Sequence, residues 1–194
     1  MFFRLTKWNT AFLLDRSLIF VHYSNMSTEA PARISAEEAA QKVLGTVWKS
    51  RSFPVDPAWI ASQLGIKVIE TELPEEVSGA IIKKKNQDPI VVISKADSKN
   101  RQRFSCAHEL GHYVYRSSEG KEEYEWIDLR DKTSGMGTKT EEVYANKFAA
   151  SLLMPQDEVK LLHKGKTPPF LMAQYFGVSD DAMNFRLQNL ALVS

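Results

Sequence analysis

The stretch His108-Glu109-Leu110-Gly111-His112 lies inside a helical pattern that covers residues 99–115. Small and apolar residues recur through this segment at steps of three and four, which is the spacing of one face of an α-helix. Two histidines four residues apart lie on the same face of a helix, one turn above each other. The stretch therefore predicts a helix that directs two imidazoles to a common point, and we expect the rest of the fold to pack against it.

The patterns on either side predict an α+β fold. Ser35 and Glu38 are spaced as in a capping box, and Pro57 suits the first turn of a helix. The expected helices cover residues 35–49, 57–64, 140–154, 156–163, 170–176 and 179–192, and the expected strands cover residues 66–69, 78–83 and 89–94. The polar segment 117–138 is expected to be a surface loop. We predict a small, mostly antiparallel sheet packed on the helix of the two histidines, with a helical C-terminal part.

The composition suits one folded domain and argues against a nucleic-acid partner. The chain has 194 residues, of which 43% are hydrophobic and 25% are charged, and both values are ordinary for a globular protein. A net charge of +1 is not the concentrated basic excess that nucleic-acid-binding proteins show. The single cysteine, Cys106, excludes an intrachain disulfide and fits a reducing compartment.

The first residues read differently from the rest. Residues 1–25 contain short apolar runs that Asp15 and Arg16 interrupt, and each run is far shorter than a membrane span requires. We therefore expect residues 1–30 to be a dispensable extension without membrane association, and residues 31–194 to form the folded domain. A weak signal or surface-anchoring segment is the alternative interpretation.

The pattern His-Glu-x-x-His carries a specific chemistry when it lies on a helix. The imidazoles of His108 and His112 can bind one zinc ion at about 2.0–2.1 Å. The metal activates a water molecule for attack on a peptide carbonyl, and Glu109 can take the proton of that water as general base. So short a pattern also arises by chance, but the amphipathic helix and the small Gly111, which leaves room for a close neighbour, favour the metal site.

A catalytic zinc usually has three protein ligands and one open position. An acidic third ligand is expected, because His22 lies in the extension and His163 follows the break at Pro155. The acidic candidates are Glu119, Glu122, Glu123, Glu125, Asp128 and Asp131 on the loop, and Glu141 and Glu142 on the next helix. A rigid helix holds ligand geometry better than a loop does, but this reasoning does not separate Glu141 from Glu142.

Two longer segments resemble the ImmA/IrrE family of metallo-endopeptidases. One is RFSCAHELGH at residues 103–112, and the other is EVYANKFAASLLMP at residues 142–155. Shorter matches lie at residues 54–57, 60–61, 64–66, 79, 176–179, 182–183 and 186–187, so that the resemblance runs from about residue 36 to residue 192. It implies a zincin-like domain with one zinc ion per chain, held by His108, His112 and Glu142, and with Glu109 as the catalytic residue. Asn146 is then placed to orient a histidine ligand.

The same resemblance implies a cytoplasmic endopeptidase that acts on a protein. Members of the family typically cut a helix-turn-helix transcriptional repressor that is encoded nearby, so the implied partner is a substrate of that kind. A component of a toxin–antitoxin pair is an alternative that the resemblance leaves open.

A DNA-binding regulator with a structural metal site is the rival interpretation. Residues 170–190 have the spacing of a helix-turn-helix, with Gly177 at the turn. However, the would-be recognition helix begins Ser179-Asp180-Asp181 and carries one cation, Arg186, whereas phosphate contacts need lysine or arginine. We therefore expect this pair of helices to pack on the catalytic core or to dock a substrate protein. A module that binds metal without cutting is a third interpretation, which the presence of Glu109 disfavours.

Overall fold

The computed structural model describes residues 34–49, 51–75, 77–118, 124–129 and 139–193. In chain order the elements are α1 (Ala36–Val43), the π-helical turn η2 (Leu44–Trp48), α2 (Pro57–Gln63), β1 (Lys67–Thr71), β2 (Val77–Lys83), β3 (Ile90–Ser94), α3 (Lys99–Ser117), β4 (Tyr124–Leu129), α4 (Lys139–Leu153), α5 (Gln156–Lys164), α6 (Pro169–Phe176) and α7 (Asp180–Asn189). The α+β class is as predicted, and each predicted helix and strand forms close to its expected limits. The extension predicted over residues 1–30 lies outside the described residues, and a folded domain over residues 31–194 stays a prediction.

The strands form one sheet in the order β1-β3-β2-β4. β2 pairs antiparallel with both β3 and β4, whereas β1 pairs parallel with β3. The parallel pair arises because the chain passes through β2 in the opposite direction before it returns as β3, between β1 and β2. The prediction of a mostly antiparallel sheet is therefore confirmed.

The prediction of an uninterrupted surface loop over residues 117–138 is wrong. The segment Tyr124–Leu129 forms β4, which pairs with β2 from Lys83↔Tyr124 to Val77↔Leu129. The segment contains two aromatic residues and one β-branched residue, which favour a strand, but its acidic residues favoured the loop interpretation. The local sequence also does not reveal that β2 offers an edge whose backbone N–H and C=O groups need partners. Other residues of the expected loop lie outside the described residues.

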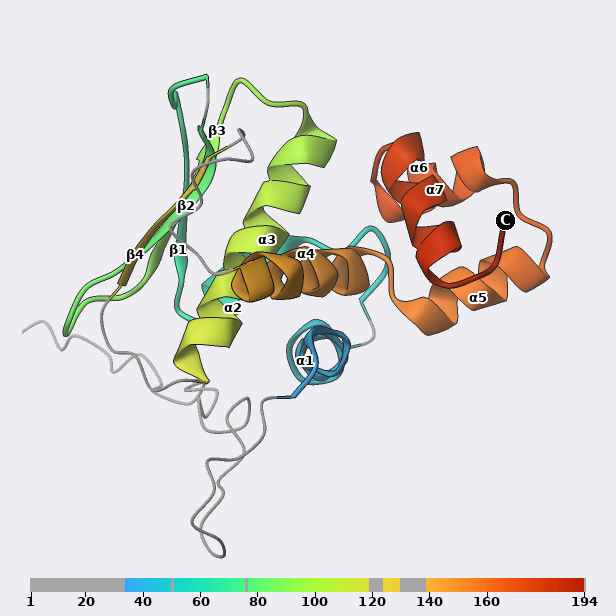
Figure 1. Ribbon diagram of the computed structural model, residues 1–194, viewed down its shortest axis with the longest axis horizontal. Coiled ribbons are helices and arrows are strands. Elements are labelled where there is room, and N and C mark those ends of the chain that lie inside the picture. The colour runs from blue at the N-terminus through green and yellow to red at the C-terminus, as the bar shows by residue number, and fades with distance from the viewer. Residues whose placement is uncertain (1–33, 50, 76, 119–123, 130–138, 194) are drawn as a thin grey trace, which may run out of the picture.

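The helix of the two histidines lies between the sheet and another helix. α3 covers one face of the sheet, where it contacts β2 and β3, and α4 crosses α3 on the side away from the sheet, with α1 packed against α4 (Figure 1). At the crossing, a Cβ on Gly111 would lie 2.8 Å from Ala145 Cα and 3.1 Å from the Ala145 carbonyl oxygen. The prediction that Gly111 makes room for a close neighbour is therefore confirmed, and this close approach brings α4 to the histidines.

Side-chain caps begin several of these helices. The hydroxyl of Ser35 accepts the Glu38 N–H at 3.2 Å, and the Glu38 carboxylate accepts the Ser35 N–H at 2.9 Å, so the predicted capping box is present. The side chains of Asp56, Ser98 and Ser179 cap α2, α3 and α7. Each accepts a hydrogen bond from at least one backbone N–H of the first turn. The cap at Ser98 sets the start of α3 and hence the turns on which its two histidines lie.

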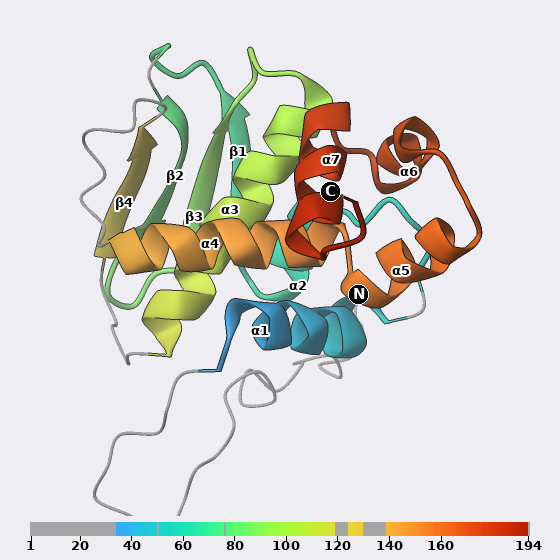
Figure 2. The same cartoon turned by 45° about the vertical axis from the view of Figure 1, so that its right-hand side comes forward.

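The helical C-terminal part lies beyond α4 on the side away from the sheet, and two arginines tie it to the rest (Figure 2). Arg103 on α3 donates hydrogen bonds to the carbonyls of Val55 at 2.6 Å, of Phe176 at 3.1 Å and of Gly177. Arg186 on α7 donates through Nε to the carbonyl of Met154 at 3.0 Å. One hydrophobic cluster joins buried residues of α1 to buried residues of α7. Among the described residues, no helix combines the length and the apolar character that crossing a membrane requires.

Candidate metal centre

Three side chains from α3 and α4 converge on one point. His112 Nε2 lies 3.0 Å from His108 Nε2, and the two carboxylate oxygens of Glu142 lie 3.5 Å from His108 Nε2 and 3.3 Å from His112 Nε2. Both histidines are buried, whereas the Glu142 side chain is 29% exposed, so solvent reaches the cluster on the side of Glu142. Within the described parts of the chain, this trio is the group of His, Cys, Asp and Glu side chains that is close enough to share a metal ion.

The outer nitrogen of each histidine is held by an oxygen atom. His108 Nδ1 lies 3.1 Å from Asn146 Oδ1, and His112 Nδ1 lies 3.0 Å from Glu141 Oε1. Because these oxygens accept hydrogen bonds, Nδ1 is the donor in both rings. Nε2 is then the nitrogen of each ring that would offer a lone pair to a metal ion, and in both rings it faces Glu142. Oxygen partners at the far nitrogen are the usual arrangement for histidines that bind metal.

The spacing of these donor atoms fits a zinc ion. Zinc lies about 2.0–2.2 Å from nitrogen and oxygen ligands and prefers tetrahedral geometry, which places neighbouring donor atoms about 3.3 Å apart. The separations here are 3.0, 3.3 and 3.5 Å. Two imidazoles and one carboxylate also leave the fourth tetrahedral position open, as in catalytic sites. The residues present therefore fit the metal that the sequence predicts.

The two neighbouring glutamates make the site attractive to a cation. Burial lowers the pKa of His112, but hydrogen bonds to Glu141 and Glu142 outweigh burial and raise this pKa to about 9. Contacts with His108 and His112 hold the pKa of Glu142 well below its usual range. Burial raises the pKa of Glu141, but its contacts with His112 and Arg116 lower it overall. Both carboxylates are therefore ionised at neutral pH.

Glu109 is fully buried beside the sheet. It precedes Leu110 on α3, and its side chain lies against Gly79 of β2, where a Cβ would come within 2.9 Å of Glu109 Oε1. The charge of Glu109 also contributes to the raised pKa of His112, so the carboxylate acts on the cluster at short range. The absence of a side chain at residue 79 thus leaves room for the carboxylate that the motif predicts to be the general base.

Comparison with known families agrees with this geometry. The family model of the IrrE N-terminal-like domain, a peptidase family, matches residues 61–188, which is more than half of the chain. The chain belongs to this peptidase family. The match begins in α2 and ends within α7, so it includes the sheet, both helices of the candidate centre and the helical C-terminal part. No curated protein matches the chain.

Membership of a peptidase family makes proteins or peptides the class of substrate. The other residues that the sequence offered as candidates lie outside the metal cluster or outside the described residues. Cys106 is buried, burial raises the pKa of its thiol, and it lies outside the cluster, as expected for a packing residue. His163 lies on α5 and does not join the cluster. Of the loop candidates, Glu119, Glu122, Glu123 and Asp131 lie outside the described residues.

Sequence reasoning missed how Glu141 contributes to the candidate metal centre. Glu141 and Glu142 both contact His112, but Glu142 faces Nε2 and Glu141 faces Nδ1. Arg116 holds Glu141 in turn, with Nε 2.6 Å from Glu141 Oε1 and Nη2 3.4 Å from Glu141 Oε2. The carboxylate of Glu141, itself held by Arg116, therefore fixes the orientation of the His112 ring. The signal available in the sequence was the pair of adjacent acids itself.

The helix-turn-helix-like segment of this peptidase does not expose its cation. Arg186 is the one lysine or arginine in α7, it is only 7% exposed, and it is bonded to the carbonyl of Met154. Asp180 and Asp181 are exposed at the start of the same helix. Since phosphate contacts dominate affinity for DNA, this surface weighs against a DNA-binding regulator. Buried residues of α6 and α7 belong to the hydrophobic core, so the predicted packing of these helices on the core is confirmed.

Proposed function

We propose that this chain is a zinc-dependent endopeptidase that hydrolyses peptide bonds in a partner protein. His108, His112 and Glu142 hold one zinc ion, and Glu109 is the general base. The observation that carries the proposal is the convergence of two Nε2 atoms and one carboxylate on a point, while Asn146 and Glu141 engage both Nδ1 atoms. Membership of the peptidase family supports the same reaction.

Each side chain has a distinct role in the proposed reaction. A bound zinc ion supplies a Lewis acid that lowers the pKa of a water molecule and polarises the scissile carbonyl. Glu109 takes the proton from the attacking water and later delivers it to the amine of the leaving peptide. Asn146 and Glu141 fix the rings of His108 and His112, so that the ligand geometry changes little during the reaction.

Substitution of Glu109 tests the chemistry separately from metal binding. Glu109→Gln keeps the size of the side chain and removes the base, so zinc measured by elemental analysis should stay near one per chain while peptide cleavage falls by about 10²–10⁴-fold. Glu75→Gln, at an exposed position that is not part of the cluster, is the matched control and should leave cleavage unchanged. The probe is a random-sequence peptide library whose products are identified by mass spectrometry. Full zinc occupancy in a His108→Ala, His112→Ala double variant would contradict the ligand assignment, and retained cleavage in Glu109→Gln would contradict the base.

The resemblance to the ImmA/IrrE family supports a helix-turn-helix repressor as the substrate and the cytoplasm as the place of action. Co-expression of the full chain with a helix-turn-helix protein encoded by a neighbouring gene tests this part of the proposal. The repressor should be cut by the wild-type chain and stay intact beside Glu109→Gln. An intact repressor in both cases, with library peptides still cut by the wild type, would reject this partner while leaving the peptidase activity standing.

A further inference from the structure

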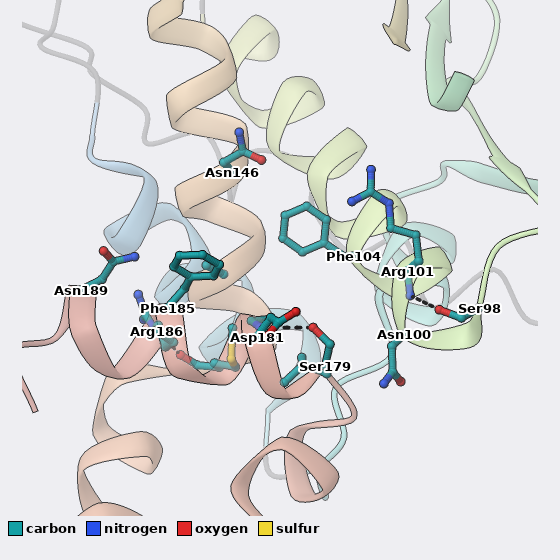
Figure 3. A pocket seen from close by; sticks show the side chains of 14 residues that line it. Ser98, Asn100, Arg101, Phe104, Asn146, Ser179, Asp181, Phe185, Arg186 and Asn189 are labelled. Carbon is teal, nitrogen blue, oxygen red and sulfur yellow. Dashed lines mark hydrogen bonds between the residues drawn. The ribbon is translucent and has the colours of Figure 1, made fainter. Parts of the chain in front are cut away.

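A pocket of about 680 Å³ lies between α3, α4 and α7 (Figure 3). Its apolar wall includes Phe104 from α3, Ala150 from α4, Met154 directly after α4, and Ala182 and Phe185 from α7. Phe104 projects from α3 towards α4, whereas Phe185 stands on the α7 side (Figure 3). Phe185 is 66% exposed although it lines the pocket, so one face of an aromatic ring is available for contact with a ligand.

The pocket continues the face of α4 that carries the candidate metal ligand. Glu142, Asn146, Ala150 and Met154 recur at steps of four, which places them in one row along the helix. Glu142 belongs to the candidate centre, and the other three line the pocket. Four residues of helix span about 6 Å, so the pocket begins about one helical turn from the metal centre.

The α3 side shows the same continuity. Phe104 lies one turn before His108, and the two ring centroids are 6.2 Å apart. Asn146, which also lines the pocket, touches His108 at 3.1 Å. One wall of the pocket is thus formed by the side chains that contact His108.

The walls are held in place before any ligand binds. Arg103 ties α3 to the turn between α6 and α7, and Arg186 ties α7 to the end of α4. Arg186 also lines the pocket, and its Nε already donates to a carbonyl of the protein. Arg101 and Asp181 are exposed charged residues of the lining. An apolar interior bordered by charge of both signs suits uncharged apolar side chains.

We propose that this pocket binds large apolar side chains of the peptide substrate, at positions within about four residues of the scissile bond. The inference rests on the proposed function, and it makes α7 part of the substrate site. Along α4, Asn146 lies about 6 Å and Ala150 about 12 Å from Glu142. An extended peptide advances about 3.3–3.6 Å per residue, so these distances correspond to about two to four residues of substrate. Pockets of about 300–1,000 Å³ hold drug-sized ligands, so this one has room for more than one side chain.

Methionine methyl groups provide a direct readout of occupancy. Met154 lines the pocket, whereas Met172 and Met183 are buried elsewhere. The full chain carrying Glu109→Gln is labelled at the methionine methyl carbons, with Met154→Leu used to assign its signal. It is titrated with acetyl-Ala-Ala-Phe-Ala-Ala-amide and with the all-alanine pentapeptide. The Met154 signal should shift and saturate with the phenylalanine peptide, with at least about tenfold tighter binding than for the alanine peptide, while the Met172 and Met183 signals stay in place.

Two substitutions on α7 form a matched pair. Ala182→Phe places an aromatic ring inside the pocket and should weaken binding of the phenylalanine peptide by at least about tenfold. Asn184→Phe adds the same side chain at an exposed position outside the pocket and should not weaken it. Phe185→Ala, at an exposed residue, serves if Ala182→Phe fails to fold, and should weaken binding by about threefold or more. With the peptide library, the wild-type chain should cut near large apolar residues, and Ala182→Phe should shift this preference towards small ones.

The outcomes separate this inference from the proposed function. Cleavage of the library without a preference for apolar residues, and without a Met154 shift, would overturn the pocket assignment and leave the peptidase standing. A Met154 shift that appears on concentrating the protein without peptide would make a second copy of the chain the occupant and would also overturn it. Binding of the phenylalanine peptide by a wild-type chain that cuts nothing would reject the proposed function and, with it, the role of the pocket in substrate selection.

Discussion

Replacing Gly79 with alanine tests how closely β2 is fitted to the proposed base. The new Cβ would lie 2.9 Å from Glu109 Oε1, 3.4 Å from Glu109 Cγ and 3.3 Å from the Val92 carbonyl oxygen. Ordinary contact between such atoms begins at about 3.4 Å, so the carboxylate must move by roughly 0.5 Å, because the backbone of β3 has less freedom to yield. A misplacement of about 1 Å in an active site costs about 10²-fold in rate, so we expect kcat to fall by about tenfold.

The same substitution should leave metal binding intact. His108, His112 and Glu142 do not touch the new methyl group, so zinc should stay near one per chain. Overpacking costs about 1–3 kcal/mol, and the lower entropy of the unfolded alanine chain offsets about 0.4–1 kcal/mol of this. We therefore expect a net loss of about 1–2 kcal/mol in the free energy of unfolding.

Gly45→Ala is the matched control, because among the described residues no atom beyond its chain neighbours and its own helix backbone lies within 4 Å of the Cβ it would add. It replaces a glycine in a helical segment and should raise the free energy of unfolding by about 0.5–1 kcal/mol without changing kcat. The assay combines urea unfolding, elemental analysis and kcat on the library peptide that the wild type cuts best. An unchanged kcat in Gly79→Ala with full zinc occupancy would refute the reasoning, since the base would then tolerate displacement.

Four further predictions concern the metal centre and the helix crossing beside it. Glu142→Ala removes a proposed ligand, whereas Glu141→Gln only loosens His112 and should raise the zinc Kd by about 10–100-fold. Glu142→Ala should therefore raise the zinc Kd by more than Glu141→Gln does. Competition with a chromophoric chelator measures both variants, and equal effects would contradict the proposed roles. Gly111→Ala places its Cβ 2.8 Å from Ala145 Cα, and because this is a backbone atom no side-chain rotation relieves the clash. The free energy of unfolding should fall by about 3 kcal/mol or more. Unchanged urea unfolding would mean that α4 can move away. Because the pKa of His112 in the metal-free protein is about 9, zinc binding at pH 7.5 should release about one proton, as shown by calorimetry in buffers of different ionisation enthalpy. The same raised pKa makes the contribution of His112 to metal-free stability fully present below pH 6.5 and lost as the pH rises through about 9, so a melting temperature that does not respond over this range would contradict the shift.

Local sequence patterns were sufficient for the helices and for the identity of the histidine pair. The four-residue spacing of His108 and His112 places both on one face of any helix, whatever surrounds it. The capping box at Ser35 and Glu38 likewise depends on residues three apart, and it forms as predicted. These features are determined by sequence alone because their partners are neighbours in the chain.

Tertiary structure decided what depends on distant partners. Spacing left Glu141 and Glu142 as equal candidates, and the crossing of α4 over α3 at Gly111 directs one to Nε2 and the other to Nδ1 of the same imidazole. β4 forms because β2 offers it a hydrogen-bonding edge. The pocket forms between helices far apart in sequence, which the hydrophobic core and the hydrogen bonds of Arg103 and Arg186 hold against one another. Contacts between remote residues are set by the packing of whole elements, and a single sequence carries no local signal of which of two adjacent side chains will face a partner that arrives from another helix.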